Sequence, residues 1–416
     1  MLRKLSIKDH LFISCLWLAY NFQWGALLPI VLPHQIASIA GPHHKEFFNG
    51  VIGPAGAVVA LIVAPLAGAV SDRSTHRLGR RRPHLIIGIV INALGLLFMA
   101  FFREGGSIWI FFLTFLFVQS GCNWWGGPYA GLIPDVVPEN QRGIASGFMM
   151  LMTAVGFTGG ALTAGQLLRL GSYLPAYGVI IIVMLGLLIV TLMGVREQPR
   201  VATPDPFRFK RLIRSFFLSP RKHADFYWVL VTRAFVGMGT FSLLTFLQYF
   251  LDDVIGVANA VQKASTLVVV IIVAGIPAGI IAGPLSDRYG RKAIVSTSSF
   301  IMALATLSYV GVALHRSWLF TILVAVIFGI GNGAYQVVDW ALAIDVLPTK
   351  EDAGKDMGIW HVSIVLPQVL GPAMTGTLLD WLKSISLLMG YQVTFIMTGI
   401  WLLLGAAFVR RIKGIR

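Results

Sequence analysis

The sequence predicts an all-α polytopic membrane protein of twelve transmembrane helices, arranged as two six-helix pseudo-repeats. Hydrophobic residues make up 56% of the 416-residue chain and charged residues only 12%, whereas soluble domains carry about 25% charged residues. Apolar runs of about 20 residues, the length that crosses a bilayer, recur along the whole chain. Charged loop motifs also occur once in each half. These observations favour a helical bundle in a membrane over a soluble fold.

The expected spans follow one another with short polar loops between them. They cover residues 11–32, 48–70, 84–102, 107–133, 143–168, 176–195, 226–251, 264–286, 293–314, 318–344, 356–381 and 386–409. Residues 1–195 would form the N-terminal six-helix bundle, 196–225 a basic cytoplasmic linker and 226–416 the C-terminal six-helix bundle. Prolines in the linker argue against a further span. Its segment 207–218 fits either a helix on the inner membrane surface or a solvated linker.

Basic residues concentrate on one predicted side of the membrane. Of the 33 Lys and Arg, 26 fall in segments assigned to the inside, 6 in segments assigned to the outside and 1 within a span. This positive-inside distribution predicts that both termini are cytoplasmic. It also accounts for the net charge of +15 without nucleic-acid binding, which would need a basic soluble domain. Cys15 and Cys122 fall within spans, so no disulfide framework is implied, and the basic N-terminus is expected to be a retained signal anchor.

The two halves repeat their loop sequences in the same order. Gly68-Ala-Val-Ser-Asp72-Arg73 after the second span recurs as Gly283-Pro-Leu-Ser-Asp287-Arg288 after the eighth. Asp135 after the fourth span recurs as Asp345 after the tenth, each with a proline three residues later. Parallel repeats of this kind place a substrate site where the halves meet, near the middle of the membrane.

Each residue of the repeated loop has a physical use in a cytoplasmic gate. Gly68 and Gly283 would let a neighbouring helix approach closely, and Gly79 and Gly290 would permit tight turns. The aspartates can accept hydrogen bonds from a helix N-terminus or pair with arginine. We expect a latch that breaks when the halves rock. Its predicted members are Gly68, Asp72, Arg73, Arg77, Gly79 and Arg80 in the first loop and Asp287, Arg288, Gly290 and Arg291 in the second.

The duplicated loops resemble the signature of the major facilitator superfamily, and the similarity in layout covers the whole chain. The first loop, Ser71-Asp72-Arg73-Ser-Thr-His-Arg77-Leu-Gly79-Arg80-Arg81-Arg82-Pro83, more specifically resembles the sucrose-transporter and glycoside–pentoside–hexuronide branch, as does Phe22-Gln23-Trp24-Gly25-Ala26-Leu27. The resemblance implies the major facilitator fold and a proton-coupled or sodium-coupled carrier of sugars or glycosides. Plant sucrose carriers would have an acidic residue within the fourth span. Here that span offers Gln119 and Asn123 but no carboxylate before Asp135, so that coupling residue is not carried over.

Three ionisable positions within spans of the second half matter most. At 1.5 Å per residue, Arg233 lies about 10 Å into the seventh span, Asp339 about 9 Å from the inner end of the tenth and His361 about 7 to 8 Å into the eleventh. Because an unpaired charge in lipid is costly, Arg233 and Asp339 are predicted to pair, with His361 nearby. Two roles stay open. Asp339 is a proton site whose protonation releases Arg233, or the pair is a permanent salt bridge.

Amide and aromatic side chains predict a polar crevice within the bundle. Asn332, Tyr335, Gln336 and Asp339 follow an i, i+3, i+4, i+7 pattern, which puts them on one stripe that lipid would not tolerate. Amides suit the hydroxyls of a neutral polyhydroxylated ligand, and indole faces suit its ring C–H groups; Trp124 could equally pack between helices. The predicted substrate-binding residues are Asn21, Gln23, Gln119, Asn123, Trp124, Asn332, Tyr335, Gln336 and Gln368.

These features predict a secondary active transporter that moves a sugar or similar neutral polar solute by alternating access, coupled to protons. A proton-driven efflux antiporter for amphipathic compounds is the alternative, and a smooth Phe- and Met-lined cavity would favour it. A non-transporting receptor is less consistent with a chain that has no soluble signalling domain. A membrane enzyme is not expected, because catalytic and metal-binding motifs are lacking. We expect no cofactor or metal, a monomer, and a multi-pass location in a bacterial inner membrane.

Overall fold

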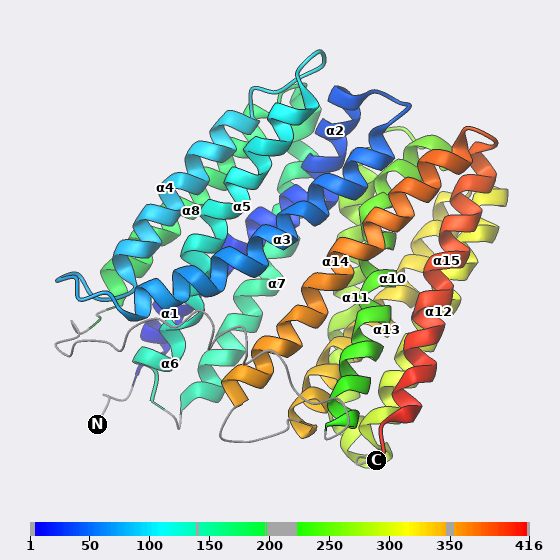
Figure 1. Ribbon diagram of the computed structural model, residues 1–416. Helices are drawn as coiled ribbons and strands as arrows, with labels where there is room; N and C mark the ends of the chain where they lie inside the picture. The colour runs from blue at the N-terminus through cyan, green and yellow to red at the C-terminus, as the bar shows by residue number, and fades with distance from the viewer. Residues whose placement is uncertain (1–4, 139–140, 196, 198–222, 347–352, 414–416) are drawn as a thin grey trace. The chain divides into compact units, whose positions relative to one another are not determined.

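Figure 1 shows the computed structural model of the chain, which describes residues 5–138, 141–195, 197, 223–346 and 353–413. Within these ranges every regular element is helical. Eleven helical runs in this part of the chain are long and apolar enough to cross a membrane, and α14 (Ala353–Lys383) is a further long helix. The predicted class, an all-α polytopic membrane protein, is confirmed.

The chain divides into two compact units, and one helix contributes to both. The first unit comprises Met1–Gly41 and Ala55–Phe207, and the second comprises Pro42–Pro54 and Arg208–Arg416. Helix α3 (Lys45–Asp72) therefore starts in the second unit and ends in the first. The first unit also holds α1 (Ile7–Ala26), α2 (Leu32–Ala40), α4 (Arg82–Met99), α5 (Ile108–Ala130), α6 (Leu132–Val136), α7 (Arg142–Leu167) and α8 (Leu174–Gly194). The second holds α10 (Ala224–Phe250), α11 (Ala260–Tyr289), α12 (Arg291–His315), α13 (Trp318–Asp345), α14 and α15 (Leu387–Phe408).

The first span is longer than the sequence analysis predicted, because it runs over Ile7–Ala40 instead of 11–32. It begins early because Ser6 and Asp9 form a capping box. The Ser6 hydroxyl accepts a hydrogen bond from the Asp9 N–H at 3.3 Å, and the Asp9 carboxylate accepts one from the Ser6 N–H at 2.7 Å. These bonds satisfy donors that a helix start leaves open. At its other end, α1 continues through a π-helical turn, Leu27–Val31, into α2.

The first helix of the second half has the same construction. Helix α10 passes directly into a π-helical turn, Leu251–Ile255, which ends at Gly256 with φ 66°. That left-handed backbone conformation favours glycine, because a Cβ would clash with the chain itself. The two halves thus repeat a π-helical turn directly after their first long helix, α1 or α10, as well as a loop sequence. Single π-helical turns often occur at functional sites.

Glycines bring helices into backbone contact inside each unit. A Cβ at Gly160 of α7 would lie 2.1 Å from the carbonyl oxygen of Phe22 on α1, and a Cβ at Gly333 of α13 would lie 2.1 Å from that of Gly275 on α11. Any larger residue would force these helix pairs apart. Close approach through small residues is how helices associate in lipid, where burial of apolar side chains supplies no driving force.

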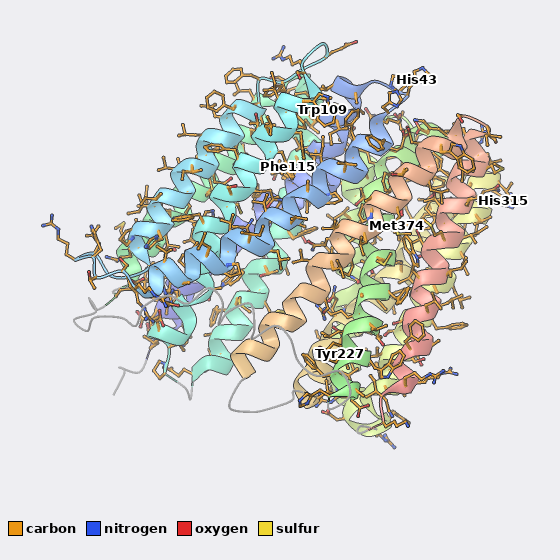
Figure 2. The ribbon with its side chains drawn as sticks, in the orientation of Figure 1. His43, Trp109, Phe115, Tyr227, His315 and Met374 are labelled. Atoms are coloured by element: carbon orange, nitrogen blue, oxygen red, sulfur yellow. The ribbon has the colours of Figure 1, made fainter. Side chains whose placement is uncertain are left out.

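Apolar side chains cover much of the outside of each unit, whereas polar side chains lie inside. On α5, Trp109 in the first turn is 61% exposed, while Phe115, six residues later, is fully buried (Figure 2). Gln23, Asn92 and Asp339 are all buried completely. This arrangement is expected where the solvent is acyl chain, because polar groups must find partners within the protein. It places the polar candidates where they can contact one another.

Candidate functional site

A buried ion pair joins α10 and α13 in the second unit. The Arg233 guanidinium Nη1 contacts Oδ2 of Asp339, and the Tyr335 hydroxyl donates to Asp339 Oδ1 at 3.1 Å. Asp339 is fully buried, and the Arg233 side chain is only 11% exposed. Because little water reaches either charge, each depends on the other for stabilisation. The structure brings together the two residues that the sequence analysis paired and adds Tyr335 as a donor to the carboxylate.

The predicted stripe on α13 divides between the inside and the outside of the unit. Tyr335 is buried beside Asp339, Asn332 is half-buried, and Gln336 is exposed. A step of about 100° per residue separates Tyr335 from Gln336, so these two lie at opposite edges of the stripe. Gln336 therefore lies outside the buried core of the unit, and the prediction that this stripe lines a water-filled crevice stays a prediction. In this part of the structure the Asn332 Oδ1 is buried without a hydrogen-bond partner.

Two further candidates lie on α14. His361 falls within this helix, but its side chain lies outside the described residues, so its predicted place beside Arg233 and Asp339 stays a prediction. Gln368 is half-buried two turns further along.

Between α14 and α10, the Thr375 hydroxyl donates to Ser242 Oγ at 2.9 Å, and both side chains are buried.

Gln119 and Asn123 form a buried amide pair on α5. The Asn123 Nδ2 donates to Gln119 Oε1 at 3.1 Å and to the Gln119 carbonyl at 2.8 Å. Gly56 on α3 makes room for this pair, because a Cβ there would lie 2.4 Å from Gln119 Nε2. The two amides are therefore held on one helix face, as predicted, with α3 packed against them. An amide pair of this kind presents both donors and acceptors.

Asn21 and Gln23 face different neighbours, although only one residue separates them on α1. Asn21 Nδ2 donates to Thr153 Oγ1 on α7 at 3.2 Å and to the carbonyl of Trp17 at 2.8 Å. Gln23 is fully buried and accepts a hydrogen bond from Asn92 Nδ2 on α4 at 2.7 Å. Asn92 was missed from the sequence, although an isolated amide in the middle of an apolar span is a signal for a buried polar partner.

Aromatic rings of α1 and α5 form a cluster that the sequence analysis did not assemble. Tyr20 contacts Trp125 with ring centroids 5.5 Å apart, and Trp17 contacts Tyr129 at 5.4 Å. Among the described residues, neither the Trp17 nor the Trp125 indole N–H has a hydrogen-bond partner. The predicted Trp124 lies elsewhere, 6.1 Å from the His84 ring. Trp125, rather than Trp124, therefore joins this cluster and is fully buried in it, while the Trp124 indole N–H likewise has no partner among the described residues.

Arg81 is the centre of the first loop motif. Its Nη2 pairs with Asp72 Oδ1 at 2.6 Å, its Nε with Asp135 Oδ2 at 3.0 Å, and its Nη1 donates to Ser71 Oγ at 2.5 Å. The predicted Arg80 joins the same network through Asp135, with its Nε 3.0 Å from Oδ2. Arg81 is 5% exposed and was not among the predicted gate residues. A fork of guanidinium donors shared between two carboxylates fixes geometry more strongly than one exposed pair.

Gly79 and Glu197 complete this network. Gly79 has φ 107°, and a Cβ there would lie 2.5 Å from Glu197 Oε2. That carboxylate accepts a hydrogen bond from the Arg81 N–H at 2.8 Å. Glu197 lies beyond the end of α8, and its burial raises the pKa of its carboxyl above the ordinary value of 4.5. The predicted tight turn at Gly79 is thus present, and it is closed by a residue from the other end of the half.

The second loop motif has a different set of described contacts. Gly290 has φ 95°, as the predicted tight turn requires. Arg291 approaches Asp287 only at 3.8 Å, and the Asp287 side chain is 72% exposed. Arg288 lies over the ring of Tyr289 at 5.4 Å. The two loops are therefore alike in backbone and unlike in their electrostatics.

Three other members of the motif differ in their contacts. Arg73 Nη1 donates to the Ala69 carbonyl at 2.7 Å, and Arg77 is exposed. At Gly68, nothing lies within 4 Å of where a Cβ would be. The close helix approach predicted at Gly68 is therefore not present in the described part of the structure. Packing in the described structure therefore does not explain why residue 68 is a glycine.

A second charged cluster holds the start of α3 within the second unit. Lys45 Nζ pairs with Asp253 Oδ1 at 2.6 Å, and the Tyr391 hydroxyl donates to Asp253 Oδ2 at 2.7 Å. Lys383 Nζ pairs with Glu46 Oε2, and Glu46 is fully buried. We call these five residues the α3 clamp. The sequence analysis counted Lys45 and Lys383 as loop charges and missed the clamp, because its members are far apart in the chain.

The described side chains include several kinds of group that can bind a polar ligand. In the part of the chain that the structure describes, no group of three His, Cys, Asp or Glu side chains is placed to hold a metal ion. What the units do offer is amide groups, aromatic rings with free indole N–H donors, and buried ion pairs. Such groups recognise hydroxyls and respond to protonation.

Comparison with protein families and sequences gives three matches that bear on function. The profile described as Major Facilitator Superfamily matches residues 13–349 and 259–414. A sucrose transport protein of Arabidopsis thaliana, SUC4, is 28% identical over 168 residues, which cover 37% of this chain and 32% of that protein. The chain thus spans only about a third of the length of this relative. The multidrug resistance protein MdtG of Serratia proteamaculans is 23% identical over 411 residues, covering 96% of this chain and 93% of that protein.

Solved structures share the fold at low sequence identity. The nucleoside transporter NupG superposes with a TM-score of 0.76 at 15% identity, covering 97% of this chain and all of NupG. A D-xylose–proton symporter superposes with a TM-score of 0.73 at 14% identity, covering 97% of each chain. At such identities the superpositions establish a common architecture and carry no residue roles.

Proposed function

The chain belongs to the major facilitator superfamily, and from this premise we propose that it moves a sugar or glycoside across the membrane by proton-coupled alternating access. It is a multi-pass membrane transporter and not an enzyme. In the proposal, the halves 1–195 and 226–416 rock about the linker 196–225. We further propose a monomer in a bacterial inner membrane, with both termini in the cytoplasm.

A neutral polyhydroxylated substrate is supported by the polar groups of the first unit. The amide pair Gln119–Asn123 offers donors and acceptors on one face of α5. Trp17 and Trp125 have indole N–H groups without partners among the described residues, beside aromatic faces that suit ring C–H groups. The similarity to sucrose transport proteins points in the same direction. Of the predicted binding residues, Gln23 and Trp124 have the weakest support, because they face Asn92 and His84 instead.

Proton coupling is carried by one observation, the buried Arg233–Asp339 pair with its Tyr335 donor. When Asp339 takes up a proton it loses its charge, and Arg233 then lacks a counter-charge in a poorly hydrated site. Arg233 would then have to move or find another acceptor, and that movement would bias the α10–α13 packing. A permanent salt bridge is the competing role, and sodium is the competing ion. The salt-bridge and sodium alternatives each predict a pH dependence of transport that differs from the one expected for proton coupling at Asp339.

Helix α3 is the proposed gating element, because it carries an ion-pair network at each end. Its first residues, Lys45 and Glu46, belong to the α3 clamp, and its last, Asp72, pairs with Arg81 in the loop motif. The two networks belong to different compact units. Alternating access requires the two sides of the membrane to open in turn. We propose that one network opens while the other holds.

Proton-driven efflux of amphipathic compounds is the second candidate. It is favoured by the match to MdtG, which covers nearly the whole of both chains. The two candidates differ in the direction of flux relative to the pH gradient. A symporter accumulates its substrate on the alkaline side, whereas an antiporter moves it against the proton flow.

Both candidates can be tested in proteoliposomes that contain the full chain. We expect an inside-alkaline pH gradient to drive accumulation of a sucrose-like glycoside, and an uncoupler to abolish it. Accumulation that needs a sodium gradient and ignores pH would reject proton coupling. Movement of amphipathic dyes against the proton flow, with no sugar flux in a panel of neutral mono- and disaccharides and glycosides, would reject the sugar proposal and favour efflux.

A further inference from the structure

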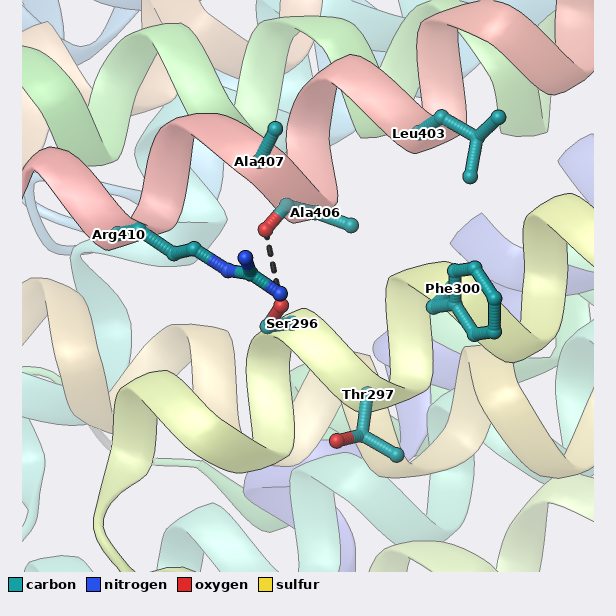
Figure 3. Close-up of a pocket in the computed structure, with 7 residues that line it drawn as sticks. All are labelled: Ser296, Thr297, Phe300, Leu403, Ala406, Ala407 and Arg410. Carbon is teal, nitrogen blue, oxygen red and sulfur yellow. Dashed lines mark hydrogen bonds between the residues drawn. The ribbon is translucent and has the colours of Figure 1, made fainter.

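A groove on the outside of the second unit lies between α12 and α15. It has a volume of about 320 Å³, and Figure 3 shows the side chains that line it. Small side chains keep it open, because Ala406 and Ala407 line it from α15, and the Ser296 hydroxyl opposite donates to the Ala406 carbonyl at 2.9 Å. Phe300 and Leu403 form its apolar end, and Phe300 is 47% exposed.

The other end of the groove is basic. Arg410 follows the last turn of α15, and Figure 3 shows its guanidinium extending across to Ser296 on α12. The chain beyond it is tied to the start of α12, because Lys292 Nζ donates to the Ile412 carbonyl at 2.9 Å. Arg411 and Lys413 add two more exposed cations. No carboxylate in the described ranges forms an ion pair with Arg410. Three residues further along the chain, the Lys413 N–H donates to the Asp225 carboxylate at 2.8 Å.

Arg410 also lies at the end of an apolar helix, where we expect the membrane to change from acyl chain to headgroup. It lies at the end of the candidate span Leu387–Arg411. Phe300 and Leu403, one to two helical turns from the basic end, lie on the part of α12 and α15 expected to face acyl chains. An arginine at a helix end beside an apolar groove matches the basic pockets between membrane helices that hold anionic lipid headgroups.

We propose that this groove binds an anionic phospholipid of the leaflet that faces the second loop motif, which directly precedes α12. The phosphate would pair with the Arg410 guanidinium and accept from the Thr297 hydroxyl at the groove's rim. One acyl chain would lie along Phe300 and Leu403, above Ala407. Because Lys292 ties the same turn to α12, the bound lipid would bridge two helices of the second unit. The site is independent of the transported solute and of the Arg233–Asp339 pair.

Selectivity for a negative headgroup distinguishes this site from ordinary lipid contact. The purified full chain is titrated in detergent with palmitoyl-oleoyl phosphatidylglycerol or with phosphatidylcholine of the same chains, and bound lipid is counted by native mass spectrometry at a fixed ionic strength. We expect the wild type to bind the anionic lipid at least about tenfold more tightly, since phosphatidylcholine keeps the phosphate but adds a quaternary ammonium that the cations Arg410, Arg411 and Lys413 repel. Equal affinity for the two lipids would overturn the proposal.

Two variants and a matched control locate the site. Arg410→Gln should lose at least about tenfold in affinity for phosphatidylglycerol, and Ala407→Phe, which fills the groove, should lose binding of either lipid there. Arg411→Gln removes the same charge one residue away, outside the groove, and should change affinity by less than about threefold, because exposed charges are screened. If Arg410→Gln binds as tightly as Arg411→Gln, the assignment is wrong. Because Arg410 is an exposed side chain that forms no ion pair with any residue of the described ranges, this variant should fold even if Ala407→Phe does not.

Discussion

The Arg233–Asp339 pair gives the most demanding test, because its two proposed roles respond differently to the same substitution. Asp339→Asn keeps the size of the side chain and removes its charge. It leaves the Arg233 guanidinium without a counter-charge at a site where the carboxylate is fully buried and the arginine is 11% exposed. The matched control is Asp287→Asn, the same change in a pair whose carboxylate is 72% exposed.

The expected loss in the free energy of unfolding follows from the burial of the pair. Removing one partner of a buried pair costs about 3–5 kcal/mol, so we expect Asp339→Asn to lower the free energy of unfolding by that amount. The control should cost less than about 1 kcal/mol, because solvent screens an exposed pair. The double variant Arg233→Gln/Asp339→Asn leaves no uncompensated charge and should recover more than half of the loss. That recovery would appear as a coupling between the two sites in a double-mutant cycle.

Two assays separate stability from function. Unfolding of the purified chain by increasing SDS in mixed micelles measures the stability terms. Uptake by proteoliposomes under an imposed pH gradient measures coupling, and there both Asp339→Asn and the double variant should lose gradient-driven accumulation while keeping exchange of substrate down its own gradient. A double variant that recovers stability and still accumulates substrate with pH would identify the pair as structural only.

The stability measurement and the transport measurement can each contradict the proposed role of the pair. A loss below about 1 kcal/mol for Asp339→Asn, equal to the control, would mean that the guanidinium finds water or another acceptor and that the pair is not sheltered. Normal proton-driven accumulation by Asp339→Asn at every pH would exclude Asp339 as the coupling site. The proposal of a sugar substrate would survive that second result, because it rests on other residues.

Three further predictions concern the ends of the helices. Gly79→Ala should lower the free energy of unfolding by about 1–3 kcal/mol, and with it the melting temperature and the transport rate. The reason is that φ 107° disfavours a side chain and the Cβ would meet Glu197. An unchanged melting curve would contradict the predicted strain. The pKa of Glu197 is raised by burial, so the folded state holds its proton more firmly than the unfolded state. The stability of the fold should therefore fall as pH rises from 4.5 through the raised pKa. Glu197→Gln should flatten that slope when thermal unfolding is measured across pH 4 to 7, about the range of a shifted carboxyl. Lys383→Met removes the nearer cation of the buried Glu46 and leaves only Lys45, whose Nζ lies 3.9 Å from Oε1. It should destabilise by about 3–5 kcal/mol, with at least half restored in Lys383→Met/Glu46→Gln; equal stability of the two variants would show that Glu46 carries no charge once Lys383 is removed.

Local sequence patterns were sufficient for the helices and for some of the site. Runs of apolar residues located the spans, because helices are the simplest way to satisfy the backbone in lipid. The turns at Gly79 and Gly290 followed from the loop motif, since glycine tolerates positive φ. The pairing of Arg233 with Asp339 followed from the cost of an isolated charge in a membrane, which leaves few partners to choose from.

Contacts between distant segments could be decided only by the tertiary structure. Lys45 and Asp253 are 208 residues apart, and Glu46 and Lys383 are 337 apart, so no local period relates them. The same holds for Glu197 against Arg81, for the exposure of Gln336 at the edge of its stripe, and for the space left open at Gly68. Sequence spacing fixes which residues share a helix face, but the neighbour that this face meets depends on how the helices pack. The positions of the charges within spans, Arg233 and Asp339, were therefore predictable from the chain, whereas the burial of Glu46 and Arg81 and the identity of their partners were not.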